Sequence, residues 1–331
     1  VNAALRGMRA GVSAKKHLDA IIDLAGDKVN LRQTIEDLRS QPSTARKSVV
    51  ALKRYCLLLL FEGYLHAHAS KQEGKRTFAE WLRDHPEYVK LMTDQDRKPM
   101  VDMLLIDAPN RTMAALDDVV HVVHDRHGSV LAPMTILKYD HFPGCQRPSL
   151  PDRIDGAPNF RQVHLTGSTK TVSVYGVAMP TESAIDGVLS RIPTLTKTLW
   201  VCLREEPVVY VNGRPFVLRQ VKDPITNLEM TGIPSRRVES MEVRLKEDVL
   251  QESVSSGRVL LHEEAEDGSG VVAVWEPVES GECVQTMADL YAKSTTSARC
   301  LFKRVAITDE QSPIPTVFDQ LSGLITAALD A

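Results

Sequence analysis

The cysteines of the sequence are the first residues to test for metal, redox or nucleophilic chemistry. The five cysteines are widely spaced, odd in number and form no Cys-x-x-Cys pair. They are Cys56, Cys145, Cys202, Cys283 and Cys300. This usage predicts free thiols in a reducing, cytosolic compartment rather than a disulfide framework or a zinc site.

Two pairs of histidines fit a metal site poorly. His66 and His68 are too closely spaced to share one face of a helix, and His121 and His124 lack a supporting cluster of carboxylates. The sequence also contains no G-x-G-x-x-G, G-x-x-x-x-G-K-[ST], H-E-x-x-H or G-x-S-x-G motif. We therefore expect neither a metal nor a cofactor.

Short turns rich in arginine and asparagine carry the other polar side chains of interest, at residues 156–161, 203–207, 212–216 and 304–309. In the third of these turns, Asn212-Gly213 separates two apolar runs. Because this pair readily adopts the positive φ angles of a type I′ turn, it predicts a β-hairpin.

Length and composition indicate an ordinary globular chain. Its 331 residues correspond to roughly two domains at about 150 residues each. The net charge of −3 gives no bulk basic field, so nucleic acid is not expected as a partner. The apolar run at residues 56–61 is far shorter than the roughly 20 residues that span a bilayer. The N-terminal stretch lacks the apolar core of a signal peptide, so we expect no secretory signal.

The elements that would position these side chains divide into a helical part and a mixed part. Apolar residues recur at helical spacing over residues 44–68, over a shorter stretch that ends near Gly26, and over residues 78–92, where Pro86 marks a break or a new first turn. After about residue 125 the pattern alternates. Strands are expected at 130–131, 135–137, 171–177, 199–203, 208–211, 216–218, 259–262, 271–275 and 301–305, and helices at 181–192, 238–254, 287–292 and 315–329.

This alternation predicts an α/β sandwich with a mostly parallel central sheet, preceded by a helical segment. The pattern ends on a helix where another strand would follow, so we expect the sheet to be incomplete.

The order of these motifs resembles the paladin family, which consists of tandem repeats similar to cysteine-dependent, tyrosine-phosphatase-like phytases. The start of one repeat is matched by residues 126–131, 135–138, 140, 142–144, 154–161, 174–180 and 200–219. The helical tail of a preceding repeat is matched by residues 30–32, 54–55 and 78–82. The resemblance implies a tyrosine-phosphatase-like fold for the mixed part.

The reaction implied by the resemblance is phosphoester hydrolysis through a covalent phosphocysteine. It requires a Cys-x5-Arg loop, in which the thiolate attacks phosphorus and the arginine binds the phosphoryl oxygens. The residues six positions after the five cysteines are Glu62, Pro151, Val208, Asp289 and Ala306. The nucleophile loop is therefore absent from this chain.

The resemblance assigns two further polar side chains. Asp309 matches the position of the family's general acid, although a helix cap or a loop carboxylate is the structural alternative. Lys170 either adds positive charge at the rim of the pocket or is a solvated loop lysine.

Arginines of the turns match positions near the family's pocket. Arg161 and Arg204 either bind an anionic substrate or, for Arg204, pair with the two glutamates that follow it and hold the strand ends together. Arg214 and Arg219, which flank the expected hairpin, are interpreted as surface charges.

The resemblance thus implies that residues 1–125 are the helical C-terminal part of one repeat and that residues 126–331 are the N-terminal part of the next. The chain would then be a fragment that lies between two phosphate loops. We expect part of a cytosolic phosphatase for inositol phosphates, phosphoinositides or phosphoproteins. The alternative is a pseudophosphatase or scaffold that binds phosphorylated ligands without turnover.

Overall fold

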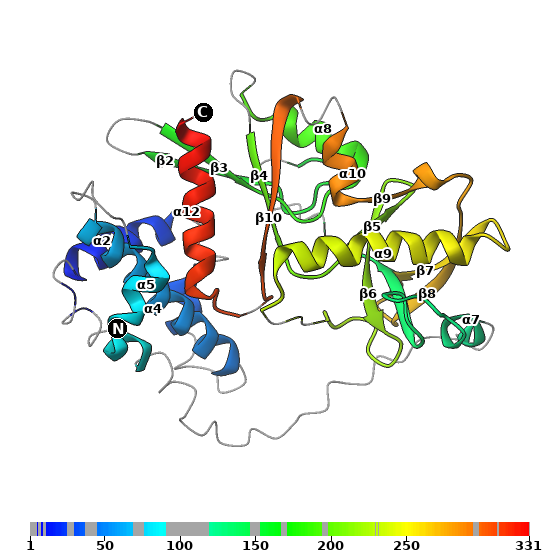
Figure 1. Ribbon diagram of the computed structural model, residues 1–331, viewed down its shortest axis with the longest axis horizontal. Helices are drawn as coiled ribbons and strands as arrows, with labels where there is room; N and C mark the ends of the chain where they lie inside the picture. The colour runs from blue at the N-terminus through cyan, green and yellow to red at the C-terminus, as the bar shows by residue number, and fades with distance from the viewer. Residues whose placement is uncertain are drawn as a thin grey trace. The chain divides into compact units, whose positions relative to one another are not determined.

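The computed structural model describes residues 5, 8, 11–24, 30–36, 45–68, 76–90, 119–145, 153–166, 171–193, 198–228, 230, 232–293, 298–309 and 311–330. The chain forms two compact units (Figure 1). Unit 1 comprises residues 1–106, 165–172 and 307–331, and unit 2 comprises residues 107–164 and 173–306.

Unit 1 is built from amphipathic helices. Its helices are α2 (Gly11–Asp23), α3 (Leu31–Glu36), α4 (Ala45–His68), α5 (Phe78–Arg83) and α12 (Pro315–Asp330). Leu18 of α2, Leu59 of α4, Phe78 of α5 and Phe318 of α12 share one apolar core. The carboxylate of Asp319 accepts hydrogen bonds from the first backbone N–H groups of α5, so α12 caps α5 as well as packing on it.

The helical periodicity of this region is confirmed. The stripe over residues 44–68 forms α4, and α5 ends at Arg83 before a second helical stretch over residues 86–90, as Pro86 led us to expect. The predicted stop near Gly26 lies outside the described residues. No described helix has both the length and the apolar character needed to cross a membrane.

Unit 2 is organised around a six-stranded sheet. Its strands are β1 (Thr135–Tyr139), β5 (Val208–Val211), β6 (Arg214–Gln220), β7 (Arg258–Glu264), β8 (Val271–Pro277) and β9 (Val284–Thr286), in the order β8-β7-β1-β6-β5-β9. Two-stranded pairs are formed by β4 (Thr198–Arg204) with β10 (Cys300–Ile307), and by β2 (Arg161–Thr166) with β3 (Thr171–Gly176).

The α/β class is confirmed, but the expectation of mostly parallel pairing is wrong. Among the described pairs of the six-stranded sheet, β1 and β7 run parallel, whereas β1–β6, β5–β6, β5–β9 and β7–β8 run antiparallel. The reason is that β5–β6 and β7–β8 are joined by short turns. Such turns reverse the chain and leave adjacent strands antiparallel.

Helices cover both faces of the sheet because its side chains alternate. Helix α9 (Ser235–Ser253) crosses one face in Figure 1, where Leu245 and Val249 pack on Val209 and Phe216. The opposite face receives α8 (Glu182–Ser190) and α10 (Met287–Ala292), which pack around Tyr210. A short helix, α7 (Val120–His124), packs on the same sheet nearer β7. Strands β1, β5 and β6 are therefore buried on both sides, whereas the edge strand β8 is partly exposed.

The predicted hairpin is confirmed. Asn212 and Gly213 have φ angles of 48° and 74°, and Val211 lies opposite Arg214 in the antiparallel register. Positive φ at both central residues is the requirement of a type I′ turn, and the Asn-Gly pair meets it.

The expected strand at residues 130–131 is wrong. The carboxylate of Asp248 on α9 accepts hydrogen bonds from the backbone N–H groups of Ser129, Val130 and Leu131. These donors are therefore engaged by a side chain, and the segment forms a bend beneath α9 although its side chains are apolar.

Candidate functional site

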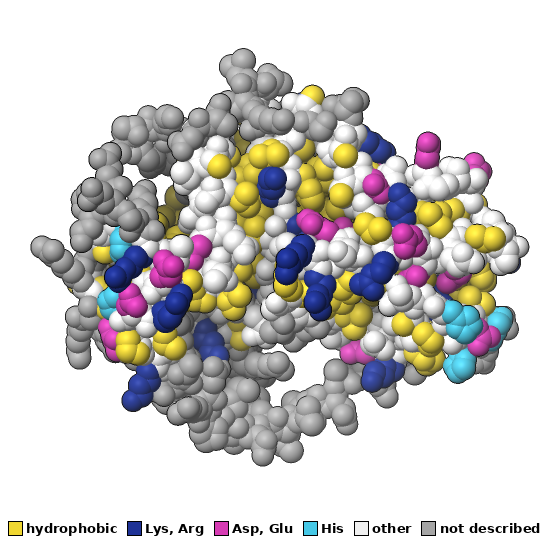
Figure 2. Space-filling view, viewed as in Figure 1, with side chains coloured by type: hydrophobic (Ala, Val, Ile, Leu, Met, Phe, Trp, Pro, Cys, Tyr) yellow, Lys and Arg dark blue, Asp and Glu magenta, His cyan; other side chains and the backbone are white. Residues whose placement is uncertain are grey.

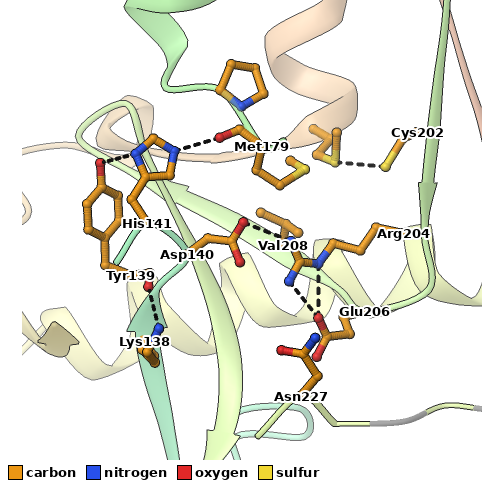
Figure 3. A network of polar contacts seen from close by, with 12 residues as sticks. Lys138, Tyr139, Asp140, His141, Met179, Cys202, Arg204, Glu206, Val208 and Asn227 are labelled. Carbon is orange, nitrogen blue, oxygen red and sulfur yellow. Dashed lines mark hydrogen bonds and ion pairs between the residues drawn. The ribbon is translucent and has the colours of Figure 1, made fainter. Parts of the chain in front are cut away.

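The polar centre of unit 2 lies where β1 and β4 end (Figure 3). Asp140 directly follows β1, and Arg204 is the last residue of β4. The Arg204 guanidinium donates from Nη1 to Asp140 at 2.8 Å, and from Nε and Nη2 to Glu206 at 3.0 and 2.7 Å. One guanidinium thus joins two carboxylates from two separate segments.

Glu206 also holds a second arginine. Its Oε1 accepts from Arg219 Nη1 at 2.9 Å and from the backbone N–H of Leu228 at 3.0 Å, and Arg219 Nη2 donates to Asn227. The side chains of Glu206 and Arg219 are 5% and 3% exposed, and that of Arg204 is 21% exposed. The positive charges of two guanidiniums are therefore balanced by the negative charges of two carboxylates in a mostly buried cluster. We call these four residues, Asp140, Arg204, Glu206 and Arg219, the arginine–carboxylate cluster.

Burial and charge act against each other on these arginines. Burial disfavours the charged form of Arg204, but the attraction of Asp140 and then Glu206 outweighs it and raises the pKa of Arg204 above its ordinary range. For Arg219 burial outweighs the attraction of Glu206 and lowers its pKa. Since an arginine remains protonated in proteins, both stay cationic and need their carboxylates.

A second buried ion pair joins Arg304, on strand β10, to Glu242 of α9. Glu242 Oε1 accepts from Arg304 Nη2 and, at 3.0 Å, from the backbone N–H of Val208. Arg304 Nη1 donates to the backbone carbonyl of Arg204 at 3.1 Å. Burial raises the pKa of Glu242 to about 7, against the lowering effect of Arg304. The Arg304 side chain is therefore fixed by α9 and β4.

A tyrosine and a histidine flank the cluster. His141 Nε2 lies 2.7 Å from the backbone carbonyl of Met179, and its Nδ1 lies 3.0 Å from the hydroxyl of Tyr139. A carbonyl only accepts, so a neutral ring carries its proton on Nε2 and receives the tyrosine proton at Nδ1. Burial raises the pKa of Tyr139, which keeps this hydroxyl a donor.

Arg161 is exposed and is the first residue of β2. Its Nη1 donates to the backbone carbonyl of Asn159 at 2.9 Å. A Cβ at position 176 would lie 2.7 Å from the Arg161 Cζ, so Gly176 leaves the space that this guanidinium occupies. The turn at Asn159 and the glycine at the end of β3 therefore set the direction of Arg161.

The other predicted site residues lie in different parts of the chain. Asp309 is an exposed residue of unit 1, two positions after the end of β10, whereas Arg161 and Arg204 belong to unit 2. Lys170 lies outside the described residues. Of the two glutamates offered as partners for Arg204, Glu206 forms the ion pair, while Glu205 accepts from the backbone N–H of Met230.

The interpretation of Arg219 as a surface charge is wrong, because its side chain is buried against Glu206. Arg214 retains partial exposure, but it forms ion pairs with Glu263 and Glu276 and lies 5.1 Å from the centre of the Tyr139 ring. Both side chains stabilise unit 2 instead of standing free in solvent.

Sequence reasoning missed Asp140 and Glu242 as members of buried polar contacts. One signal was available for Glu242. It occupies a core position of α9, four residues after Val238 and three before Leu245, where an apolar side chain is expected. A carboxylate on the apolar stripe of a helix indicates a buried cationic partner.

All five cysteines are free, and Cys56, Cys202 and Cys300 are buried. Cys202 lies beside the cluster, with its thiol 3.8 Å from the sulfur of Met287 (Figure 3). Burial raises the pKa of Cys202, which disfavours the thiolate that a nucleophile needs.

Comparisons with known proteins find one family model and several individual proteins that this chain resembles. Residues 201–330 match the family model of the PTP-like phytases, described by the words inositol hexakisphosphate. Human paladin is 27% identical over 212 residues, or 62% of this chain and 20% of the relative. Paladin of Gallus gallus is 23% identical over 290 residues, or 86% of this chain and 28% of the relative. These matches agree with the resemblance of the sequence to the paladin family.

The chain spans between 17% and 34% of the length of the curated paladins that it matches. Among solved structures, the PTP-like myo-inositol phosphatase of Mitsuokella multacida, in complex with myo-inositol-(1,3,4,5)-tetrakisphosphate, is 18% identical. That match has a TM-score of 0.39 and covers 59% of this chain and 32% of the other.

The cluster predicts a specific stability effect. Glu206→Gln leaves two mostly buried guanidiniums short of a counter-charge, so we expect urea denaturation to give a free energy of unfolding lower by about 3 kcal/mol. The control is Glu263→Gln at the part-exposed ion pair with Arg214, where a loss below about 1 kcal/mol is expected. Equal losses in the two variants would contradict the central position of Glu206.

A buried histidine predicts a pH effect on stability. His262 lies opposite Lys138 in the sheet, and burial, reinforced by Arg126, lowers its pKa to about 4 from its usual value of 6.5. Between these values the unfolded chain binds more protons, so stability is complete above about pH 6.5 and falls as the pH drops toward 4.

We expect the wild-type protein to lose about 2 kcal/mol more than His262→Leu between pH 7 and pH 4.5 in denaturant titrations. His127→Leu, which changes an exposed histidine of the same unit, serves as the control and should retain the wild-type pH dependence. Parallel pH profiles for wild type and His262→Leu would refute the assignment.

Proposed function

We propose that the protein is a paladin-like cysteine-dependent phosphatase that hydrolyses phosphoesters of inositol phosphates, phosphoinositides or phosphoproteins. In this proposal residues 1–125 end one phosphatase-like repeat and residues 126–331 begin the next. The observation that carries the proposal is the family match over residues 201–330, which includes β10 and the exposed Asp309 that follows it.

The chemistry would divide between this stretch and a loop outside it. A thiolate from a Cys-x5-Arg loop attacks phosphorus, the bond from phosphorus to the leaving oxygen breaks, and Asp309 gives that oxygen a proton. Water, deprotonated by the same aspartate, then hydrolyses the phosphocysteine. Since the 331 residues hold no Cys-x5-Arg motif, they contribute the acid and the pocket walls.

Substrate binding is assigned to cations that remain accessible. Arg161 is exposed and directed by its bond to the Asn159 carbonyl, which leaves further guanidinium donors for phosphoryl oxygens. We also propose Lys170 as a substrate-binding residue, as the resemblance to the family implies. Arg204, proposed from the resemblance as a substrate ligand, would act mainly by holding Asp140 and Glu206 in place.

The cysteines and the surface charge bear on the cellular compartment and on the partners of the protein. Five free cysteines favour a reducing cytosolic compartment. Basic and acidic side chains are interspersed over α9 in Figure 2, and the net charge is −3, so a nucleic-acid partner is not favoured.

One observation favours the second candidate, a pseudophosphatase or scaffold that binds phosphorylated ligands without turnover. Arg204, Arg219 and Arg304 are each paired with a carboxylate inside unit 2. Arginines that are already neutralised add little attraction for a phosphate, and this supports a structural use of the pocket region.

The two candidates separate in an assay of a protein that carries this stretch together with its phosphate loop. With an aryl phosphate and inositol hexakisphosphate as substrates, we expect phosphate release that Asp309→Asn slows by about 100-fold or more. Asp155→Asn, at an exposed carboxylate of unit 2, should leave the rate unchanged.

An unchanged rate for Asp309→Asn would overturn the acid assignment. Saturable binding of inositol hexakisphosphate without phosphate release, weakened by Arg161→Ala, would instead establish the scaffold. The 331-residue chain alone should release no phosphate in either case.

A further inference from the structure

Two histidines and a glutamate converge in unit 1, outside the region discussed for phosphatase chemistry. Glu62 and His66 are one turn apart on α4, and His17 lies on α2, 45 residues before Glu62 in sequence. Glu62 Oε1 is 2.6 Å from His17 Nδ1 and 3.2 Å from His66 Nε2. The three ligand atoms all lie within 4.8 Å of one another.

This spacing suits a small divalent cation. Bonds of about 2.0–2.2 Å to imidazole nitrogen and carboxylate oxygen place tetrahedral ligand atoms about 3.3–3.5 Å apart. The three atoms need only side-chain adjustments of about an ångström to reach that arrangement. Imidazole nitrogens select metals of the zinc class over magnesium or calcium, and two histidines with one glutamate form a recognised donor set for zinc.

The helices hold the ligands close together before any ion is bound. Leu18, next to His17 in sequence, packs in the same core as Leu59 of α4. About two turns before Glu62, the hydroxyl of Tyr55 on α4 donates to Asp19 of α2 at 2.7 Å. Asp19 is itself paired with Lys15 and Arg32, so Glu62 is the carboxylate placed to serve the two histidines.

The exposure of the cluster permits entry of an ion. The side chains of His17 and His66 are 60% and 38% exposed, while Glu62 is 14% exposed and lies between them. With three ligands from the protein, a tetrahedral ion retains one position for water.

We propose that His17, Glu62 and His66 form a binding site for a divalent zinc-class metal ion that joins α2 to α4. The site is independent of the phosphatase proposal, since it needs no phosphate loop. Sequence reasoning did not find it because it considered His66 with His68, whereas the partner that completes the set comes from another helix.

The test uses the tag-free 331-residue chain at pH 7.5, titrated with Zn²⁺ by calorimetry and with Co²⁺ by visible absorption. We expect one ion per chain, a Co²⁺ spectrum typical of four or five ligands, and a melting temperature that rises with added Zn²⁺. His17→Ala and Glu62→Gln should each weaken binding by at least about tenfold.

His68→Ala is the matched control, because His68 lies on α4 two residues beyond His66 and outside the cluster, with its Nδ1 2.8 Å from the carbonyl of Tyr64. It should bind Zn²⁺ like the wild type. Circular dichroism without metal verifies that each variant is folded. Absence of binding at micromolar Zn²⁺, or equal affinity for wild type, His17→Ala and Glu62→Gln, would overturn the proposal.

Lowering the pH gives a second readout that a merely structural triad would not produce. Protons compete with the metal ion for the imidazole nitrogens, so Zn²⁺ affinity should be lower at pH 5.5 than at pH 7.5. A Zn²⁺ affinity that does not change between pH 7.5 and pH 5.5 would place the ion on other groups and contradict the assignment.

Discussion

A guanidinium removed from water is costly unless a carboxylate and further acceptors replace its hydration, and this requirement organises the centre of unit 2. Glu206 meets it for two arginines at once, with one carboxylate oxygen facing Arg204 and the other facing Arg219. Arg204 in turn fixes Asp140 at the end of β1. The C-terminal ends of β1, β4 and β6 are therefore linked by ion pairs.

The same constraint reaches the turn that carries the proposed acid. Arg304 is held by Glu242 of α9 and by the carbonyl of Arg204, and Asp309 follows five residues later in sequence. Arg204, which the resemblance assigns near the pocket, thus has a structural role, because Asp140 and Glu206 of the same chain neutralise its charge. Phosphate recognition by this stretch must rest on accessible cations, of which Arg161 is our proposed example.

Local patterns were sufficient to predict the elements that depend on local chemistry. The Asn212-Gly213 hairpin, the helix α4 and the helix α10 follow from turn geometry and periodicity. Local patterns could not predict whether neighbouring strands run parallel or antiparallel, because the direction depends on which strands become neighbours in the sheet. The bend at residues 129–131 needed knowledge of Asp248, which is more than a hundred residues distant in sequence. The burial of Arg219 likewise depended on Glu206, so its charge alone was misleading.

The most direct measurement of the central claim is the nitrogen NMR signal of the Arg204 side chain during addition of inositol hexakisphosphate to the 331-residue chain. If Arg204 is held by Asp140 and Glu206, its Nε–H resonance stays protected from exchange with water and does not move as the ligand is added. A resonance that exchanges rapidly, or that shifts in a saturable way with inositol hexakisphosphate, would show that Arg204 is free to bind phosphate and would contradict the account.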